Sequence, residues 1–331
     1  MRQRREPAAG RTAGCGMRVL VTGGAGFIGS AYVRAALAGE YGPAGPTAVT
    51  VLDLLTYAGR RDNLPAHHDR LRFVQGDVRD VATLAEVVPG HDAVLHFAAE
   101  SHVDRSVSDA DDFVSTNVLG TQRLLDACRR AGVRTVLCVS TDEVYGSIDV
   151  GAWSEEAPLA PNSPYAAAKA GADLLARAYH RTHGLDVRIT RGCNTYGPHQ
   201  NVEKLIPRFV TNLLSGEPAP LYGDGRNRRE WLHVADHCAA IQLVLTAGAP
   251  GGVYNIGSGV ELTNAELATR LVRLCAADPG LIRHVTDRKG HDLRYALDST
   301  RIATLGFRPR TEFAAGLAAT VDWYRTHRGW W

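Results

Sequence analysis

Residues 17–29, with the sequence MRVLVTGGAGFIG, join a short apolar run to a glycine-rich turn and then to the start of an amphipathic segment. Gly23, Gly26 and Gly29 have the spacing G-x-x-G-x-x-G. Glycines at such a strand–helix junction let the backbone approach a pyrophosphate, which the free N–H groups and the dipole of the helix N-terminus favour. The triplet alone also fits a simple tight turn, so the surrounding sequence has to decide between the two interpretations.

The segments that follow continue an alternation of strand and helix. Apolar runs typical of buried strands occur at 17–22, 49–53, 71–75, 93–97, 135–140 and 187–191. Segments with helical character lie between them at 27–38, 81–87, 114–131 and 165–183. Strands joined by helices in this way form a parallel sheet with helices on both faces. The sequence therefore predicts an α/β protein with a Rossmann-type doubly wound parallel sheet.

The alternation ends after Asn194, where a region rich in proline and glycine begins. The segment 231–257 then has the pattern of a helix followed by a strand, and 262–276 is helical again. We expect a smaller, discontinuous α/β substrate lobe, because 331 residues exceed what one hydrophobic core usually organises. The expected parts are a dinucleotide-binding domain of 17–194 plus 231–257, a substrate lobe formed mainly by 195–230 plus 258–331, and a disordered tail of 1–16.

The composition argues against several classes of protein. Hydrophobic residues make up 45% of the chain and charged residues 22%, which is typical of a globular enzyme. The 37 basic and 35 acidic residues are mixed along the chain, so we expect neither nucleic acid nor a membrane as partner. The six cysteines show no CxxC pair and no zinc-site spacing, which predicts no metal site and a reducing, cytoplasmic location.

Two aspartates stand where predicted strands end. Asp53 closes the second strand, where a carboxylate accepts hydrogen bonds from an adenosine ribose and repels a 2′-phosphate. This position favours NAD over NADP as the cofactor. Asp77 follows the third strand. Its side chain fits two roles equally well, which are contact with the adenine edge and capping of the next helix.

Tyr165 and Lys169 stand four residues apart in a predicted helix, which places them on one helix face. A free tyrosine has a pKa of roughly 10 and needs a nearby cation to act as a base near neutrality. Lys169 is placed to be that cation. The preceding strand ends in Ser140 and Thr141, whose hydroxyls can bind a sugar hydroxyl beside the tyrosine, so this order favours a catalytic pair over a surface pair.

Several longer motifs carry a family resemblance that spans 17–331. TGGAGFIG (22–29), STDEVYG (140–146), YAAAK (165–169) and GGVYNIGSG (251–259) resemble the extended short-chain dehydrogenases that act on nucleotide sugars. DLLTYAG (53–59), HFAAESHVDRS (96–106), EKLIPRF (203–209), RREWLHVADH (228–237) and KGHDLRYALD (289–298) resemble the dTDP-glucose 4,6-dehydratase family within that superfamily. The resemblance implies a hydro-lyase that uses NAD and acts on dTDP-glucose.

Asp142 and Glu143, directly after Thr141, separate a dehydratase from an epimerase or decarboxylase of the same fold. Once C4 of the sugar is a ketone, one carboxylate can remove the C5 proton while a carboxylic acid protonates the departing C6 hydroxyl. The resemblance implies that Glu143 is the base and Asp142 the acid. It also implies that the hydride taken from C4 returns to C6, which yields a 4-keto-6-deoxy sugar and leaves NAD unconsumed. UDP-glucose as substrate, or a 4-epimerase or decarboxylase, is the alternative.

The resemblance further implies two binding sets. The expected NAD-binding residues are Gly23, Gly26, Phe27, Ile28, Gly29, Asp53, Leu54, Leu55, Thr56, Asp77, Val78, Phe97, Ala98, Ala99, Ser101, Thr116, Tyr165, Lys169 and Thr195. The expected substrate-binding residues are Ser101, Thr141, Asn194, Lys204, Leu205, Pro220, Tyr222, Arg229, Asn264, Arg288 and His291. Cations among them suit the diphosphate. Tyr222 fits equally well stacking on a base and packing between the lobes.

One position departs from the family pattern, which has two asparagines before Tyr-Gly-Pro where this chain has Asn194 and Thr195. Threonine is shorter and lacks the amide, so the cofactor contact there differs. The family's helices also imply a homodimer in which 114–131 and 165–183 pack across a two-fold axis as a four-helix interface.

Overall fold

The computed structural model describes residues 16–331, so the predicted tail lies, apart from Gly16, outside the described residues. A seven-stranded sheet with the order β10-β6-β5-β4-β1-β2-β3 forms its centre. Its strands are β1 (Arg18–Thr22), β2 (Ala48–Asp53), β3 (Leu71–Gln75), β4 (Ala93–His96), β5 (Thr135–Thr141), β6 (Asp186–Gly192) and β10 (Val253–Ile256). All neighbouring strands run parallel. The six predicted strands and the later return to the sheet are confirmed, and so is the Rossmann-type fold.

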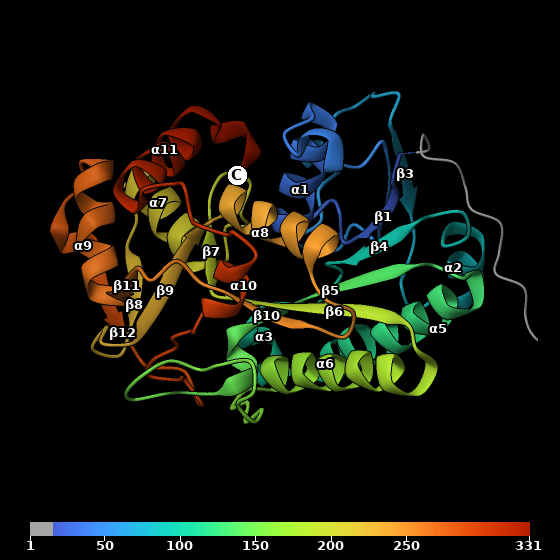
Figure 1. The fold of residues 1–331 in the computed structure, drawn as a ribbon. Helices are drawn as coiled ribbons and strands as arrows, with labels where there is room; N and C mark the ends of the chain where they lie inside the picture. Colours follow the sequence, from blue (N-terminus) through green and yellow to red (C-terminus); the bar gives the residue numbers. More distant parts are fainter. Residues whose placement is uncertain (1–15) are drawn as a thin grey trace, which may run out of the picture.

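Helices cover both faces of the sheet, as Figure 1 shows. One face carries α1 (Phe27–Ala38) and α8 (Val234–Ala247), and the other carries α2 (Val81–Val87), α5 (Thr121–Ala131) and α6 (Pro164–His183). Side chains alternate along each strand, so Val19 and Val21 pack into one apolar cluster and Leu20 into the other. No helix within 16–331 is long and apolar enough to cross a membrane.

A second group of elements lies beside the carboxyl ends of the strands (Figure 1). It contains a three-stranded sheet, β11-β9-β7, and a two-stranded sheet, β12-β8, around a separate apolar cluster. The strands are β7 (Asn194–Tyr196), β8 (Ala219–Tyr222), β9 (Arg228–His233), β11 (Glu261–Thr263) and β12 (Ile282–Val285). The helices are α7 (Leu205–Ser215), α9 (Asn264–Cys275) and α11 (Phe313–Thr326), whereas α10 (Thr300–Thr304) packs against β10 of the large sheet. We call this group the substrate lobe, and its exact boundaries stay a prediction.

A buried ion pair ties α6 to the sheet. Arg191 of β6 donates from Nε to a carboxylate oxygen of Asp173 on α6 at 2.9 Å, and their side chains are 0% and 2% exposed. The same guanidinium donates from an Nη atom to the Tyr145 hydroxyl at 2.7 Å, and that hydroxyl donates to Asn255 of β10 at 2.8 Å. The pair thus joins the helix that carries Tyr165 and Lys169 to the turn that carries Asp142 and Glu143.

We predict that Arg191→Met lowers the free energy of unfolding by about 3–5 kcal/mol, because it leaves the Asp173 carboxylate buried without its partner. Urea unfolding followed by tryptophan fluorescence measures the loss. Arg226→Met is the matched control, since Arg226 pairs with Asp224 on the surface at 3.2 Å, and it should change the free energy by less than about 0.5 kcal/mol. An equal loss in both variants would contradict the structural role of the buried pair.

Candidate active site

Two adjoining cavities lie where the carboxyl ends of the strands meet the substrate lobe. The larger has a volume of about 1750 Å³ and runs from the glycine-rich turn to Tyr165 and Lys169. The smaller, of about 1020 Å³, lies between α3 (Val103–Ser108), α7 and the loop after β12. Glu143, Asn194 and Lys204 line both cavities. We call them the cofactor cleft and the substrate pocket.

The glycine-rich turn has the geometry of an anion site. Gly23 has a φ of 68°, and a Cβ at Gly29 would lie 2.3 Å from the Gly23 carbonyl oxygen, so a side chain at Gly29 requires the turn to move. Helix α1 begins directly after Gly26, and no side chain caps its first N–H groups. These free donors face the cleft and suit a pyrophosphate.

Asp53 lies at the end of β2 and is buried beneath the turn. Its carboxylate accepts hydrogen bonds from the N–H of Ala25 and from the N–H of Leu55, both at 2.8 Å. Burial raises its pKa, and these backbone donors oppose the rise. Asp53 therefore orders the turn in addition to lining the cleft.

Asp77 is not the cap of α2. That cap is Asp80, whose carboxylate accepts from the N–H of Ala82 at 3.0 Å and from the N–H of Thr83 at 3.3 Å. Asp77 lines the cofactor cleft and forms an ion pair with Arg79 at 2.8 Å. The sequence left two roles open for Asp77. The helix cap is now excluded, and contact with the adenine of a bound cofactor stays a prediction.

The structure gathers nearly all of the predicted cofactor residues around one cleft. The exception is Leu55, whose side chain packs against the apolar cluster on the α1 face and does not line the cleft. Leu55 has a φ of 58°, and this left-handed conformation turns its side chain toward that cluster. The predicted residues that do line the cleft are Gly23, Gly26, Phe27, Ile28, Gly29, Asp53, Leu54, Thr56, Asp77, Val78, Phe97, Ala98, Ala99, Ser101, Thr116, Tyr165, Lys169 and Thr195.

Thr195, the departure from the family pattern, has a partner that the sequence did not suggest. Its hydroxyl lies 2.7 Å from Nδ1 of the buried His237 and donates to the Cys193 carbonyl at 3.2 Å. The short side chain is thus satisfied inside the protein while it lines the cleft.

The predicted catalytic residues come from two elements that meet at the inner end of the cleft. Thr141, Asp142 and Glu143 follow directly from β5, and Tyr165 and Lys169 lie in the first turns of α6. Helix α6 begins there because the Ser163 side chain caps it and Pro164 occupies its first turn. All five residues line the cleft.

The two adjacent acids have different surroundings. Burial raises the pKa of Asp142 well above its usual range, and the Glu143 and Glu230 charges raise it further, while Arg229 opposes them. Burial also raises the pKa of Glu143, but there the charges of Arg229, Lys204 and Arg288 oppose the rise. Asp142 therefore holds its proton more strongly than Glu143 does.

The tyrosine and lysine are both buried, with 9% and 8% of their surfaces exposed. Burial raises the pKa of Tyr165 well above its usual range, and the charges of Glu143 and Asp142 add to the rise. Burial lowers the pKa of Lys169, which Asp173 opposes, and the Lys169 ammonium donates to the Val139 carbonyl at 2.7 Å. In the protein alone, burial therefore outweighs the lowering of the Tyr165 pKa that we expected from Lys169.

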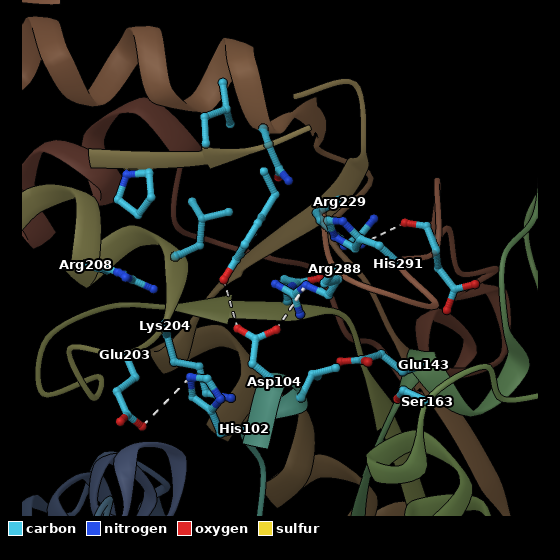
Figure 2. Close-up of a pocket in the computed structure, with 18 of the residues that line it drawn as sticks. His102, Asp104, Glu143, Ser163, Glu203, Lys204, Arg208, Arg229, Arg288 and His291 are labelled. Carbon is cyan, nitrogen blue, oxygen red and sulfur yellow. Dashed lines mark hydrogen bonds and ion pairs between the residues drawn. The ribbon is translucent and has the colours of Figure 1, made fainter. Parts of the chain in front are cut away.

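The substrate pocket brings together basic side chains from three segments of the substrate lobe, which are the start of α7, β9 and the loop after β12. Figure 2 shows Lys204, Arg208, Arg229, Arg288 and His291 around one space, with Glu143 at its inner side. The predicted substrate residues at this pocket are Asn194, Lys204, Leu205, Pro220, Tyr222, Arg229, Asn264, Arg288 and His291. Ser101 and Thr141 line the neighbouring cofactor cleft. No cluster of metal-ligating side chains occurs among residues 16–331.

Arg229 is more constrained than a simple phosphate cation. It is 7% exposed, its Nη2 donates to the Asp292 carbonyl at 2.9 Å, and its Nη1 donates to the Arg228 carbonyl at 2.7 Å. Its guanidinium also lies over the Tyr295 ring, 4.4 Å from the ring centre. Its charge therefore acts on Asp142 and Glu143 from a fixed position.

Several pocket residues had no predicted role, although the quoted motifs contain them. HVDRS holds His102 and Asp104, EKLIPRF holds Glu203, and KGHDLRY holds Asp292. Their acidic character gave no sequence signal for a pocket that binds an anion. Ion pairs with distant arginines hold Asp104 and Glu203 there, whereas the Asp292 carboxylate accepts hydrogen bonds from Asn162 and Tyr295.

The comparisons with known proteins agree with this geometry. A family model described as GDP-mannose 4,6 dehydratase matches residues 20–320. A dTDP-glucose 4,6-dehydratase of Streptomyces niveus is 59% identical over 95% of each chain.

The chain belongs to the nucleotide-sugar 4,6-dehydratase family. Its resemblance to the dTDP-glucose enzymes is confirmed. DesIV, a dTDP-glucose 4,6-dehydratase of Streptomyces venezuelae with a crystal structure containing NAD, is 62% identical, superposes with a TM-score of 0.94, and is matched over 95% of this chain and 99% of its own. A UDP-glucose 4-epimerase of Thermus thermophilus, also solved with NAD, is 33% identical with a TM-score of 0.86, covering 94% of this chain and 100% of its own.

We predict that Gly29→Ala weakens NAD binding at least about tenfold, because its methyl group would meet the Gly23 carbonyl oxygen and shift the turn. Isothermal titration of protein stripped of nucleotide measures the affinity. The control is Gly329→Ala, where the added methyl group meets nothing within 4 Å. Wild-type affinity in Gly29→Ala would show that the turn does not hold the pyrophosphate.

Proposed function

We propose that the protein dehydrates dTDP-glucose to dTDP-4-keto-6-deoxyglucose with NAD as a resident cofactor. The observation that carries the proposal is the pair Asp142 and Glu143, which lines the cofactor cleft beside Tyr165, while Glu143 also opens onto the substrate pocket. The names and NAD-containing structures of the relatives support the same substrate and cofactor.

The cofactor cleft fits NAD. The glycine-rich turn and the uncapped start of α1 would hold the pyrophosphate, and Asp53 would face the adenosine ribose, where its charge disfavours a 2′-phosphate. The chemistry that NAD supplies when bound is reversible storage of a hydride. The protein's own residues must handle the protons.

Each proton transfer has a candidate residue. Tyr165 takes the proton of the C4 hydroxyl, with Lys169 one helical turn away. Glu143, held toward its ionised form by three cations, removes the C5 proton after C4 has become a ketone. Asp142, kept protonated by burial and by the Glu143 charge, gives its proton to the departing C6 hydroxyl, which leaves as water. Protonation of Asp142 also removes one of the charges that raise the pKa of Tyr165.

An epimerase of this fold is the second candidate, because the fold is shared with the UDP-glucose 4-epimerase. Epimerisation requires oxidation only at C4 and has no use for a base at C5 or an acid at C6. Asp142 and Glu143 lie in environments that give them different proton affinities, as an acid and a base require. This difference favours dehydration over epimerisation.

We predict that Glu143→Gln lowers kcat by about 10²–10⁴-fold, because the base at C5 is lost. Mass spectrometry of protein incubated with dTDP-glucose, without added NAD, measures the loss of one water from the substrate. In the wild type, the acid limb of the kcat profile should lie above the ordinary glutamate pKa of about 4.3, since the raised pKa means that the base is lost earlier as pH falls.

The control is Glu217→Gln, an exposed change on the loop after α7 that should leave turnover unchanged. UDP-glucose run in parallel separates the thymidine from the uridine nucleotide. No loss of water with either nucleotide sugar from wild-type protein that carries NAD would refute the dehydratase and favour the epimerase.

We further propose that the protein is a cytoplasmic homodimer. The two long helices α5 and α6 pack side by side on one face of the sheet, as Figure 1 shows. Large apolar side chains are exposed on α6 and on the helical turns 114–120 that lead into α5, with Val114, Leu119 and Leu174 exposed by 53%, 40% and 55%. This surface suits the four-helix interface expected from the family. The five described cysteines are all free, which fits a reducing compartment.

We predict that Leu174→Glu converts the dimer to a monomer near 35.7 kDa, because the charge would be buried in the interface. Size-exclusion chromatography with light scattering measures the mass. Val150→Glu is the matched control, since Val150 is 86% exposed on the loop between β5 and α6, outside both helices, and it should leave the dimer intact. A monomeric wild type, or a dimeric Leu174→Glu, would contradict the interface.

A further inference from the structure

Asp104 joins the two sides of the substrate pocket. It lies on α3, which follows the β4 strand of the large sheet, whereas Tyr222 ends β8 and Arg288 follows β12 in the substrate lobe. The Tyr222 hydroxyl donates to one Asp104 carboxylate oxygen at 3.1 Å, and Nε of Arg288 lies 3.4 Å from the other. Figure 2 shows the Asp104 carboxylate turned toward Arg288.

The same two partners also contact each other. The Arg288 guanidinium lies over the Tyr222 ring, 4.9 Å from its centre. Asp104, Tyr222 and Arg288 therefore form a closed set in which each touches the other two, and all three line the pocket. We call this set the cross-lobe triad.

The geometry leaves the outer end of Arg288 available. The buried Nε forms an ion pair with Asp104 but no hydrogen bond, and no hydrogen bond or ion pair from the Nη atoms to another residue in 16–331 is present. The carboxylate thus restricts a long, flexible side chain to a position over the ring, while the Nη donors remain free for an anion. Tyr222 has its hydroxyl satisfied and its ring held in place.

We propose that Asp104 is a positioning residue for the nucleotide diphosphate. It holds the Tyr222 ring and the Arg288 guanidinium in the arrangement that binds the nucleotide. Because Asp104 follows a strand of the large sheet, it also connects these two side chains of the substrate lobe to the sheet that carries Asp142 and Glu143. This inference rests on the proposed function, since it takes a nucleotide sugar as the ligand. The competing arrangement is an Asp104 carboxylate that occupies Arg288 in place of the phosphates.

Binding of dTDP, which lacks the sugar and cannot react, tests the proposal. Isothermal titration of the NAD-loaded enzyme should give a dissociation constant about tenfold higher for Asp104→Ala than for the wild type. Asp104→Asn should lose less, because its amide oxygen still accepts the Tyr222 hydroxyl. With dTDP-glucose, KM should rise more than kcat falls. Asp224→Asn, a change in the exposed pair with Arg226, should leave dTDP binding unchanged.

A double-mutant cycle separates positioning from simple destabilisation. Tyr222→Phe removes only the hydroxyl, so Asp104→Ala should weaken dTDP binding less in the Tyr222→Phe background than in the wild type. Tighter dTDP binding by Asp104→Ala or Asp104→Asn would instead establish competition for Arg288 and overturn the proposal. Additive effects of the two substitutions, or an unchanged dissociation constant, would overturn it as well.

The same titrations distinguish this proposal from the proposed function. If the wild type binds dTDP but does not dehydrate dTDP-glucose, the reaction is wrong while the cycle still reports on Asp104. If the wild type binds UDP and not dTDP, the cycle is run with UDP. Thermal midpoints of all variants show whether a change in affinity reflects loss of folding, and Asp104→Asn, the smaller change, keeps the test valid if Asp104→Ala unfolds.

Discussion

The site depends on one constraint, which is that all seven strands of the large sheet run parallel. Their carboxyl ends must then meet at one edge, and each strand delivers its next residues to the same place. The turn after β1, the aspartate that closes β2 and the acids after β5 are far apart in sequence but line one cleft. The Arg191–Asp173 pair adds the helix that carries Tyr165 and Lys169 to this edge.

The surrounding charges then give different pKa values to acidic groups that the backbone has brought together. Burial raises the pKa of both Asp142 and Glu143, which are neighbours in the chain. Nearby negative charges raise the Asp142 pKa further, whereas three cations oppose the rise at Glu143. The cations come from the substrate lobe, so the acid–base character of residues on the sheet is set by the second lobe. Arg229 can do this because backbone carbonyls hold its guanidinium in place.

Each lobe therefore contributes residues that control the part of the site carried by the other. The substrate lobe supplies charge to the catalytic acids, and α3, which follows a strand of the large sheet, supplies Asp104 to the nucleotide pocket. Such mutual dependence explains why acidic side chains occur in a pocket whose ligand is expected to be an anion. Asp104 and Glu203 there are paired with Arg288 and Arg105, and so contribute position more than net charge.

The sequence by itself predicted the parallel sheet, the glycine-rich turn and the Tyr165–Lys169 pair, and its family resemblance predicted most of the residues that line the cofactor cleft. The sheet, the turn and the pair follow from local rules, since period and turn chemistry act over a few residues and parallel strands bring their ends together. Only the tertiary structure decided that Asp80 and not Asp77 caps α2, that Leu55 packs against the apolar cluster on the α1 face, and that burial raises the pKa of Tyr165. It also decided the pairing of Asp104 with Arg288 across the lobes. The physical reason is that these outcomes depend on burial and on contacts between residues distant in the chain, which no spacing along the sequence records.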